Sequence, residues 1–145
     1  MDAIKNLLSR KSSKNLEAPF PSKKEMDIVY QSALRAPDHA WLRPSKFLEF
    51  KGESLEELSK IFTNFANDHF QDDKAFIEKA KAAPFRAPMV IVLITEIKDH
   101  PKVPAIEQML STSAATQNIL LALHALGYGA IWKTGKLALN ENIPK

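Results

Sequence analysis

The sequence contains a run of six consecutive apolar residues, Met89-Val90-Ile91-Val92-Leu93-Ile94, which gives the clearest indication of the fold. The run is rich in β-branched side chains, and unbroken apolarity over this length is typical of a strand covered on both faces. We therefore expect a strand over residues 89–94 at the centre of a sheet. The run is far too short to cross a lipid bilayer.

A long helix is predicted after this strand. Pro104 suits its first turn, the pattern continues to Leu126, and Gly127 supplies the stop. Residues 111–116 carry small side chains that let another backbone come close, whereas residues 119–126 are apolar on nearly every side. A helix of this kind must be buried on several sides. Its cover is either a partner subunit or the rest of the same subunit, and the pattern favours neither.

Two further helices are predicted toward the N-terminus. The first is a short amphipathic helix over about residues 3–10, with Ile4, Leu7 and Leu8 at helical spacing. Ser22 and Glu25 have the spacing of a capping box and open the second helix, which Pro37 stops. The apolar face predicted for this second helix consists of Met26, Val29, Ala33 and Leu34.

The remaining helices and strands are predicted from the pattern of apolar residues, from helix-capping residues and from glycine and proline. A strand covers residues 46–51 and ends at a glycine. Ser54 and Glu57 repeat the capping-box spacing and open a helix with an apolar stripe made of Leu55, Leu58, Ile61, Phe62 and Phe65. A shorter helix is predicted over residues 73–83, and a last strand over residues 128–132.

Composition narrows the class of protein. A chain of 145 residues with 45% hydrophobic and 26% charged side chains is long enough for one ordinary domain with a sizeable core. Its net charge of +3 lacks the clustered positive stripe of a nucleic-acid-binding protein and fits a small anionic ligand better. The chain has no cysteine, which excludes disulfides and thiolate metal sites and suits a reducing cytoplasm.

Several kinds of site are missing from the sequence. Four glycines, all outside the required spacings, leave neither a Walker loop nor a Rossmann fingerprint, so a bound phosphate must be held by side chains. The four histidines lack the close spacing of two-histidine metal sites, and no G-x-S-x-G elbow offers a serine nucleophile. Hydrolase and metalloenzyme functions therefore have little support.

The run Arg10-Lys11-Ser12-Ser13-Lys14 concentrates anion-binding groups directly after the first predicted helix. It can hold a phosphorylated cofactor, because arginine donates two parallel charge-assisted hydrogen bonds to a phosphate. The alternative is a solvated basic cluster that interacts favourably with the helix C-terminus.

Four cationic motifs in order along the chain resemble those of the FMN-dependent nitroreductase family, and in particular its minimal bacterial YdjA-like branch. The motifs are Arg10-Lys11-Ser12, Arg35-Ala36-Pro37-Asp38-His39, Arg43-Pro44-Ser45-Lys46-Phe47 and Gly127-Tyr128-Gly129-Ala130-Ile131-Trp132-Lys133-Thr134-Gly135. The resemblance spans essentially the whole chain. It implies an α+β fold, a three-layer α-β-α sandwich with a central, mainly antiparallel sheet.

The resemblance also implies where FMN would bind. Arg10, Lys11 and Ser12 would hold the ribityl phosphate arm, and Lys14 would approach the pyrimidine edge of the isoalloxazine. Arg35 and His39 would reach the flavin from the opposite subunit of a homodimer. The later flavin-contacting segment would consist of Trp132, Lys133 and Thr134. Lys11, Lys133 and Thr134 are departures from the Arg, Arg and Ser of this branch.

The implied activity is a two-stage transfer. NADH or NADPH gives a hydride to flavin N5 and leaves, and a nitroaromatic or quinone-like acceptor then takes its place. No side-chain acid or base is required, no metal is implied, and neither a nucleic acid nor a membrane is a partner. A flavin-dependent dehalogenase, a flavin-degrading enzyme of the same fold and a non-redox basic binding module remain alternatives.

The resemblance finally bears on domain organisation. Residues 1–145 are expected to form a single FMN-binding domain. The family's members continue with a further strand and an extension, so we expect the chain to be incomplete at its C-terminus, to lack the C-terminal strand and to hold FMN less tightly than a longer version.

Overall fold

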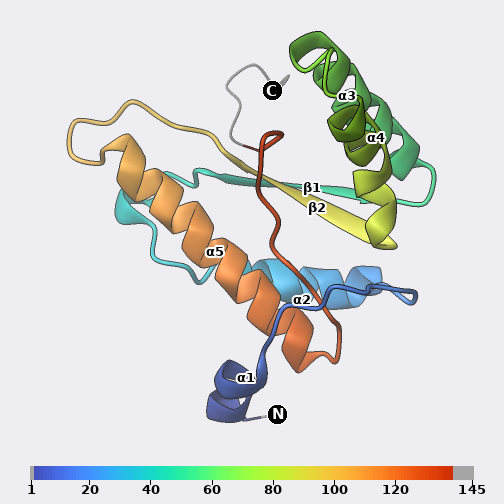
Figure 1. Ribbon diagram of the computed structural model, residues 1–145. Helices are drawn as coiled ribbons and strands as arrows, with labels where there is room; N and C mark the ends of the chain where they lie inside the picture. The colour runs from blue at the N-terminus through green and yellow to red at the C-terminus, as the bar shows by residue number, and fades with distance from the viewer. Residues whose placement is uncertain (1, 139–145) are drawn as a thin grey trace. The chain divides into compact units, whose positions relative to one another are not determined.

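The computed structural model describes residues 2–138 (Figure 1). Two compact units can be distinguished within these residues. The first consists of residues 2–14, 20–48 and 91–131, and the second of residues 15–19, 49–90 and 132–138. None of the described helices combines the length and apolarity needed to span a lipid bilayer.

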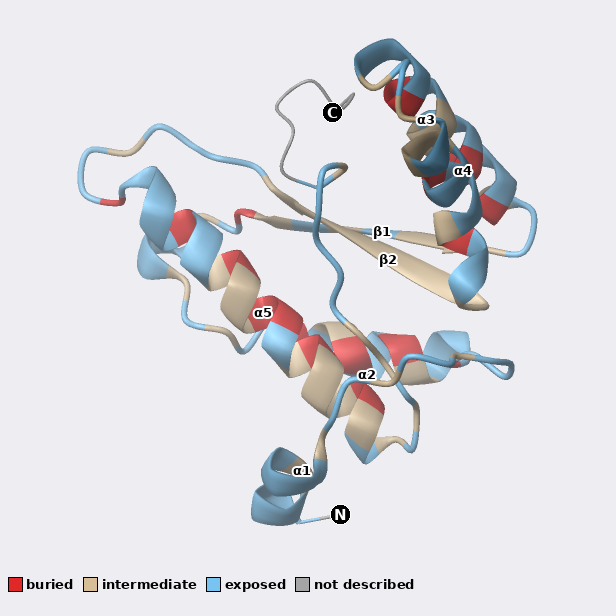
Figure 2. Ribbon diagram, in the orientation of Figure 1, coloured by how far each residue is buried: buried red, intermediate tan, exposed pale blue. Residues whose placement is uncertain are grey.

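The core of the first unit lies between α2 (Lys23–Ala33) and α5 (Ala105–Ala125). Both helices carry buried residues (Figure 2), and Asn118 of α5 donates a side-chain hydrogen bond to the Ser32 carbonyl at 3.0 Å. The buried apolar residues are Met26, Val29 and Ala33 of α2 and Ala115, Ile119 and Leu123 of α5. The predicted apolar face of α2 is confirmed except for Leu34, which lies just past the end of the helix and is exposed.

The start of α2 and the end of α5 follow local rules. The capping box at the start of α2 is confirmed, because the Ser22 hydroxyl accepts from the Glu25 N–H and the Glu25 carboxylate accepts from the Ser22 N–H. The end of α5 is a Schellman motif, in which the Tyr128 N–H bonds the Leu123 carbonyl at 2.9 Å. Gly127 adopts φ +92°, a left-handed conformation that favours glycine, so the predicted stop is also confirmed.

The first unit also contains α1 (Ala3–Ser9) and a short 3₁₀ helix, η1 (His39–Trp41). The Asp2 carboxylate caps α1 by accepting the Lys5 N–H at 2.9 Å. This helix was expected over about residues 3–10, and its observed bounds agree with that expectation.

The second unit packs α3 (Ser54–His69) against α4 (Lys74–Ala82) and the 3₁₀ helix η2 (Ala83–Arg86). Its buried apolar residues are Leu55, Leu58, Phe65, Ala66, Ala80 and Pro84. Three of the five predicted stripe residues are therefore buried, whereas Ile61 is 41% exposed.

The predicted capping box at Ser54 is wrong. Glu53 is the N-cap of α3, and no side chain caps it. The Ser54 hydroxyl instead donates to the Lys51 carbonyl at 2.9 Å and accepts the Lys51 N–H at 2.8 Å. Gly52 between them adopts φ +56°, which turns the chain back and brings Lys51 within reach.

Two strands, β1 (Ser45–Lys51) and β2 (Met89–Thr95), pair in a small antiparallel sheet. The α+β fold class is thus confirmed. The central position expected for residues 89–94 is not, because β2 has one strand neighbour within residues 2–138 and is only half-buried along its length. Residues 128–132 form no strand, since this segment lacks a ladder of backbone hydrogen bonds and pairs by one bond from Ser13 to Ala130.

Candidate functional site

The basic segment Arg10–Lys14 is positioned by contacts at the C-terminal end of α5. The Asn6 side-chain amide donates to the Leu121 carbonyl at 3.0 Å, and the Ser9 hydroxyl lies 3.0 Å from Nε2 of His124. Past α1, the Ser13 N–H donates to the Ala130 carbonyl at 3.1 Å. The N-terminal segment and the segment after α5, far apart in sequence, therefore lie side by side.

The charges of this segment are uncompensated. Arg10 is half-buried, and Lys11, Ser12 and Lys14 are exposed. Within the described part of the chain, none of the three cations forms an ion pair. Two ammonium groups, a guanidinium and a hydroxyl are a donor set that suits a phosphate group. The residues present therefore fit the phosphate arm that the sequence predicted.

The segment that pairs with Ser13 is itself fixed to the start of α2. The Tyr128 hydroxyl donates to the Glu25 carboxylate, with both oxygens at 3.2 Å. Hydrogen bonds from the Ser22 hydroxyl and backbone N–H, with a smaller contribution from Tyr128, hold the pKa of Glu25 below its ordinary value. Partial burial and the bond to Glu25 raise the pKa of Tyr128 above its ordinary value. Sequence analysis missed this link, which joins residues about a hundred positions apart.

Arg35 and His39 lie near the other end of α5. The Nδ1 atom of His39 is 2.8 Å from a Glu107 carboxylate oxygen, and because a carboxylate only accepts, this nitrogen carries the proton. The Ser111 hydroxyl donates to the Pro37 carbonyl at 2.8 Å, which fixes the same loop. Arg35 is exposed and forms no ion pair within residues 2–138. Glu107 is a residue that sequence analysis missed.

The two groups of predicted site residues are kept apart within one chain. Leu121 anchors the N-terminal segment and Glu107 anchors His39, and at a rise of about 1.5 Å per residue these helix positions are roughly 20 Å apart. Arg10 and Lys11 on one side and His39 on the other are thus not brought together by α5. Arg35 lies in between, because its neighbours Ser32 and Pro37 are hydrogen-bonded to Asn118 and Ser111.

Trp132, Lys133 and Thr134 belong to the second unit and are exposed, with Trp132 at 44%. Trp132 is therefore not a core aromatic residue. Two residues further along the chain, the Lys136 ammonium group lies 3.3 Å from the Asp73 carboxylate and 4.8 Å from the ring centroids of both Phe70 and Phe76.

This Lys136 cluster fixes the end of the segment on α4. The Asp73 carboxylate also caps α4 by accepting the Phe76 N–H, and this bond, together with Lys136, lowers the pKa of Asp73. No motif in the sequence indicated Lys136.

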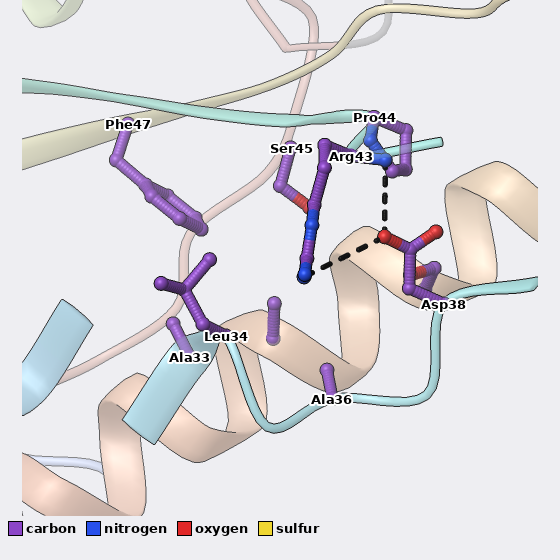
Figure 3. Close-up of a pocket in the computed structure, with 10 residues that line it drawn as sticks. Ala33, Leu34, Ala36, Asp38, Arg43, Pro44, Ser45 and Phe47 are labelled. Carbon is purple, nitrogen blue, oxygen red and sulfur yellow. Dashed lines mark hydrogen bonds and ion pairs between the residues drawn. The ribbon is translucent and has the colours of Figure 1, made fainter. Parts of the chain in front are cut away.

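A small cavity in the first unit lies beside the Pro37–Pro44 loop (Figure 3). Its volume is about 50 Å³, enough for a few water molecules and far too small for a tricyclic ring system. Asp38 and Arg43 line it and form an ion pair at 3.8 Å. This cavity therefore does not accommodate a flavin ring.

The chain matches the Nitroreductase family over residues 7–139. A protein named "Putative NAD(P)H nitroreductase YdjA" from Escherichia coli (strain K12) is 36% identical over 137 residues, which are 94% of this chain and 74% of the relative.

Solved structures resemble the fold. A nitroreductase-like family protein from Bacillus cereus superimposes with a TM-score of 0.77 at 22% identity, over 93% of this chain and 71% of that one. A nitroreductase with bound FMN from Bacteroides fragilis gives 0.67 at 20% identity, over 86% and 65%. At these identities the structural likeness establishes the fold alone.

Proposed function

This chain belongs to the nitroreductase family, and we propose from this premise that it is an FMN-dependent NAD(P)H oxidoreductase acting on nitroaromatic or quinone-like acceptors. The observation that carries the proposal is the set of unpaired cations at Arg10, Lys11 and Lys14, held in place by α1 and by Ala130. An enzyme of this class has to retain a phosphorylated cofactor, and the segment offers the donors for it.

Each residue of the segment has a proposed role. Arg10, Lys11 and Ser12 hold the phosphate arm of FMN, with Arg10 as the bidentate donor and Lys11 as a single point charge. Lys14 places a cation at the pyrimidine edge, where it stabilises negative charge on the ring. Trp132, Lys133 and Thr134 supply the later contacts, and the Lys136 cluster fixes the end of their segment.

The redox chemistry is supplied by FMN when it is bound, which accepts a hydride from NAD(P)H and passes it to the acceptor. The chain's own residues bind and orient the partners. Donor and acceptor occupy the same place in turn, so no separate dinucleotide fingerprint is needed, and no side chain has to move a proton.

The proposed site is completed by a second copy of the chain. Arg35 and His39 reach the flavin of the partner subunit, which for His39 agrees with its separation of roughly 20 Å along α5 from the anchor of the N-terminal segment. The bond to Glu107 fixes the His39 ring. Exposed apolar side chains on the same half of α5, namely Ile106, Met109 and Leu110, support a subunit contact there. We place the homodimer in the cytoplasm, as its cysteine-free composition suits a reducing compartment.

The decisive experiment is flavin uptake. The purified chain is incubated with excess FMN and passed through a gel-filtration column, and the protein peak is expected to be yellow and dimeric. Anaerobic NADH or NADPH should bleach the flavin absorption, and a nitroaromatic or quinone should restore it. A colourless monomer overturns the proposal, and a yellow protein that NAD(P)H cannot bleach leaves a flavin-binding module without redox activity.

A further inference from the structure

The Trp41 side chain is 77% exposed, more than any other tryptophan or phenylalanine among the described residues. It stands in the loop between α2 and β1, two residues after His39. The Arg43 guanidinium lies 5.0 Å from the centre of the Trp41 ring, within the range of a cation–π interaction. An indole ring with a cation beside it is thus presented to the surroundings.

The backbone of this loop is strained. Ala40, Trp41 and Arg43 have φ values of +58°, +53° and +50°, in the left-handed region that side chains with a Cβ seldom adopt. Such conformations persist only when surrounding structure enforces them, and they cluster at binding sites.

The surrounding contacts do enforce this conformation. The Asp38 carboxylate accepts the backbone N–H group of Arg43 at 3.0 Å (Figure 3) and that of Leu42 at 3.1 Å. The Lys98 ammonium group donates to the Leu42 carbonyl, and the Glu96 N–H donates to the carbonyl of buried Pro44 at 2.8 Å. Trp41 is therefore exposed because the loop is held rigidly in that shape, and its ring is preorganised for contact.

We propose that Trp41 and Arg43 bind the electron acceptor, and that they select flat aromatic acceptors carrying a negatively charged substituent. The inference rests on the proposed function, in which His39 of the same loop contacts the flavin. The acceptor ring stacks on Trp41, as offset aromatic pairs do.

The anionic substituent is bound by Arg43. Its guanidinium carries five N–H donors, is about half exposed, and meets Asp38 only at 3.8 Å, so donors remain for a carboxylate. Asp38 itself is already occupied by two backbone N–H groups. Lys98, which follows β2, places a second cation beside this loop, where its ammonium group donates to the Leu42 carbonyl.

The test isolates the reaction of the reduced protein with the acceptor. FMN-loaded protein is reduced anaerobically with dithionite and then reoxidised by 4-nitrobenzoate or by its neutral methyl ester, and each rate is compared with that of the unsubstituted chain for the same acceptor. The variants are Trp41→Leu, Trp41→Phe and Arg43→Gln, with Phe85→Leu as a matched control at another exposed aromatic side chain. FMN uptake and gel filtration are recorded for each variant.

We expect Trp41→Leu to slow reoxidation by both acceptors about tenfold, and Trp41→Phe to cost no more than about threefold, because an aromatic face is retained. Arg43→Gln should slow reoxidation by 4-nitrobenzoate about tenfold and leave the rate with the methyl ester nearly unchanged, because only the carboxylate loses a charged hydrogen bond. Phe85→Leu should behave as the unsubstituted chain.

Three results overturn the inference. Equal rates in Trp41→Leu and the unsubstituted chain remove the stacking role, and equal losses for acid and ester in Arg43→Gln remove the charge selection. If the Trp41→Leu variant is a monomer in gel filtration, the indole ring of Trp41 belongs to the subunit contact and not to the acceptor site. In all three cases the unsubstituted chain still takes up FMN, whereas its failure to do so overturns the proposed function itself.

Discussion

The basic segment Arg10–Lys14 and the loop Asp38–Arg43 both present cations, but they differ in how these charges are partnered. In the first, Arg10, Lys11 and Lys14 have no ion pair within residues 2–138. In the second, His39 is paired with Glu107 and Arg43 with Asp38, and three residues have positive φ. Cations without an ion pair on an unstrained segment suit the capture of a phosphate, whereas cations held beside carboxylates on a strained loop suit the positioning of an aromatic ring and its anionic substituent.

The largest effect on FMN affinity is expected when Arg10 is removed. Arg10→Ala takes away the bidentate donor and should weaken FMN binding about 30-fold, the range expected for lost charge-assisted hydrogen bonds. Fluorescence titration with FMN measures the effect. Lys60→Ala, which removes an exposed charge on α3, is the control and should bind FMN normally. Equal FMN affinities in Arg10→Ala and Lys60→Ala would show that Arg10 does not contact the cofactor.

Lys11→Arg should raise the FMN affinity of the same segment. Restoring a planar fork next to Arg10 should tighten FMN binding by about threefold, because a guanidinium pairs bidentately with phosphate and an ammonium group does not. The titration used for Arg10 measures this change. Weaker binding would show that the point charge of Lys11 is the better fit.

The strain of the second region is tested at Ala40. Ala40→Gly removes the Cβ at φ +58° and should stabilise the chain by about 0.5 kcal/mol, since relief of left-handed strain slightly exceeds the added entropy of the unfolded state. Ala114→Gly, inside α5, is the opposite control and should destabilise it by about 1 kcal/mol. Urea unfolding distinguishes the two, and a loss of stability in both variants would argue against strain at Ala40.

The smallest effect concerns the pH dependence of the contacts beside the first region. Because the folded pKa of Glu25 is lowered, its contribution to stability is present above about pH 4.5 and is lost as the pH falls through the folded pKa. Because the folded pKa of Tyr128 is raised, its contribution is present below pH 10.0 and is lost as the pH rises through the folded pKa.

Tyr128→Phe should therefore lower the melting temperature at neutral pH and flatten its fall above pH 10.0. Glu25→Gln should flatten the fall below pH 4.5. Thermal unfolding followed by circular dichroism from pH 3 to 11 records both limbs. A variant with the unsubstituted pH profile would show that the Tyr128–Glu25 contact contributes nothing to stability.

Local features of the fold could be predicted because each depends on a few neighbouring residues. Ser22 with Glu25 specifies a helix start, and Gly127 specifies a helix end, whatever the rest of the chain does. Ser54 shows the limit of this logic, since its hydroxyl had a competing partner in Lys51 that the turn at Gly52 brought close.

The site could be predicted only in part. A resemblance between motifs picked out Arg10 and His39, and whether they contact FMN stays a prediction. The pairs His39–Glu107 and Lys136–Asp73 join residues more than sixty positions apart, so no local pattern encodes them. The positive φ of Trp41 was equally hidden, because propensity alone disfavours it and only the Asp38 and Lys98 contacts enforce it.

The length of α5 has one more consequence for a site shared between copies. If each flavin takes Arg10 from one chain and Arg35 from the other, then Arg10→Ala and Arg35→Ala each damage both sites of their own homodimer. Subunit mixing of the two variants should regenerate one intact site in every hybrid, and flavin retention should rise above that of either parent. Because α5 holds the N-terminal segment at Leu121 and the loop that follows Arg35 at Glu107, about 20 Å apart, complementation between defective copies is expected.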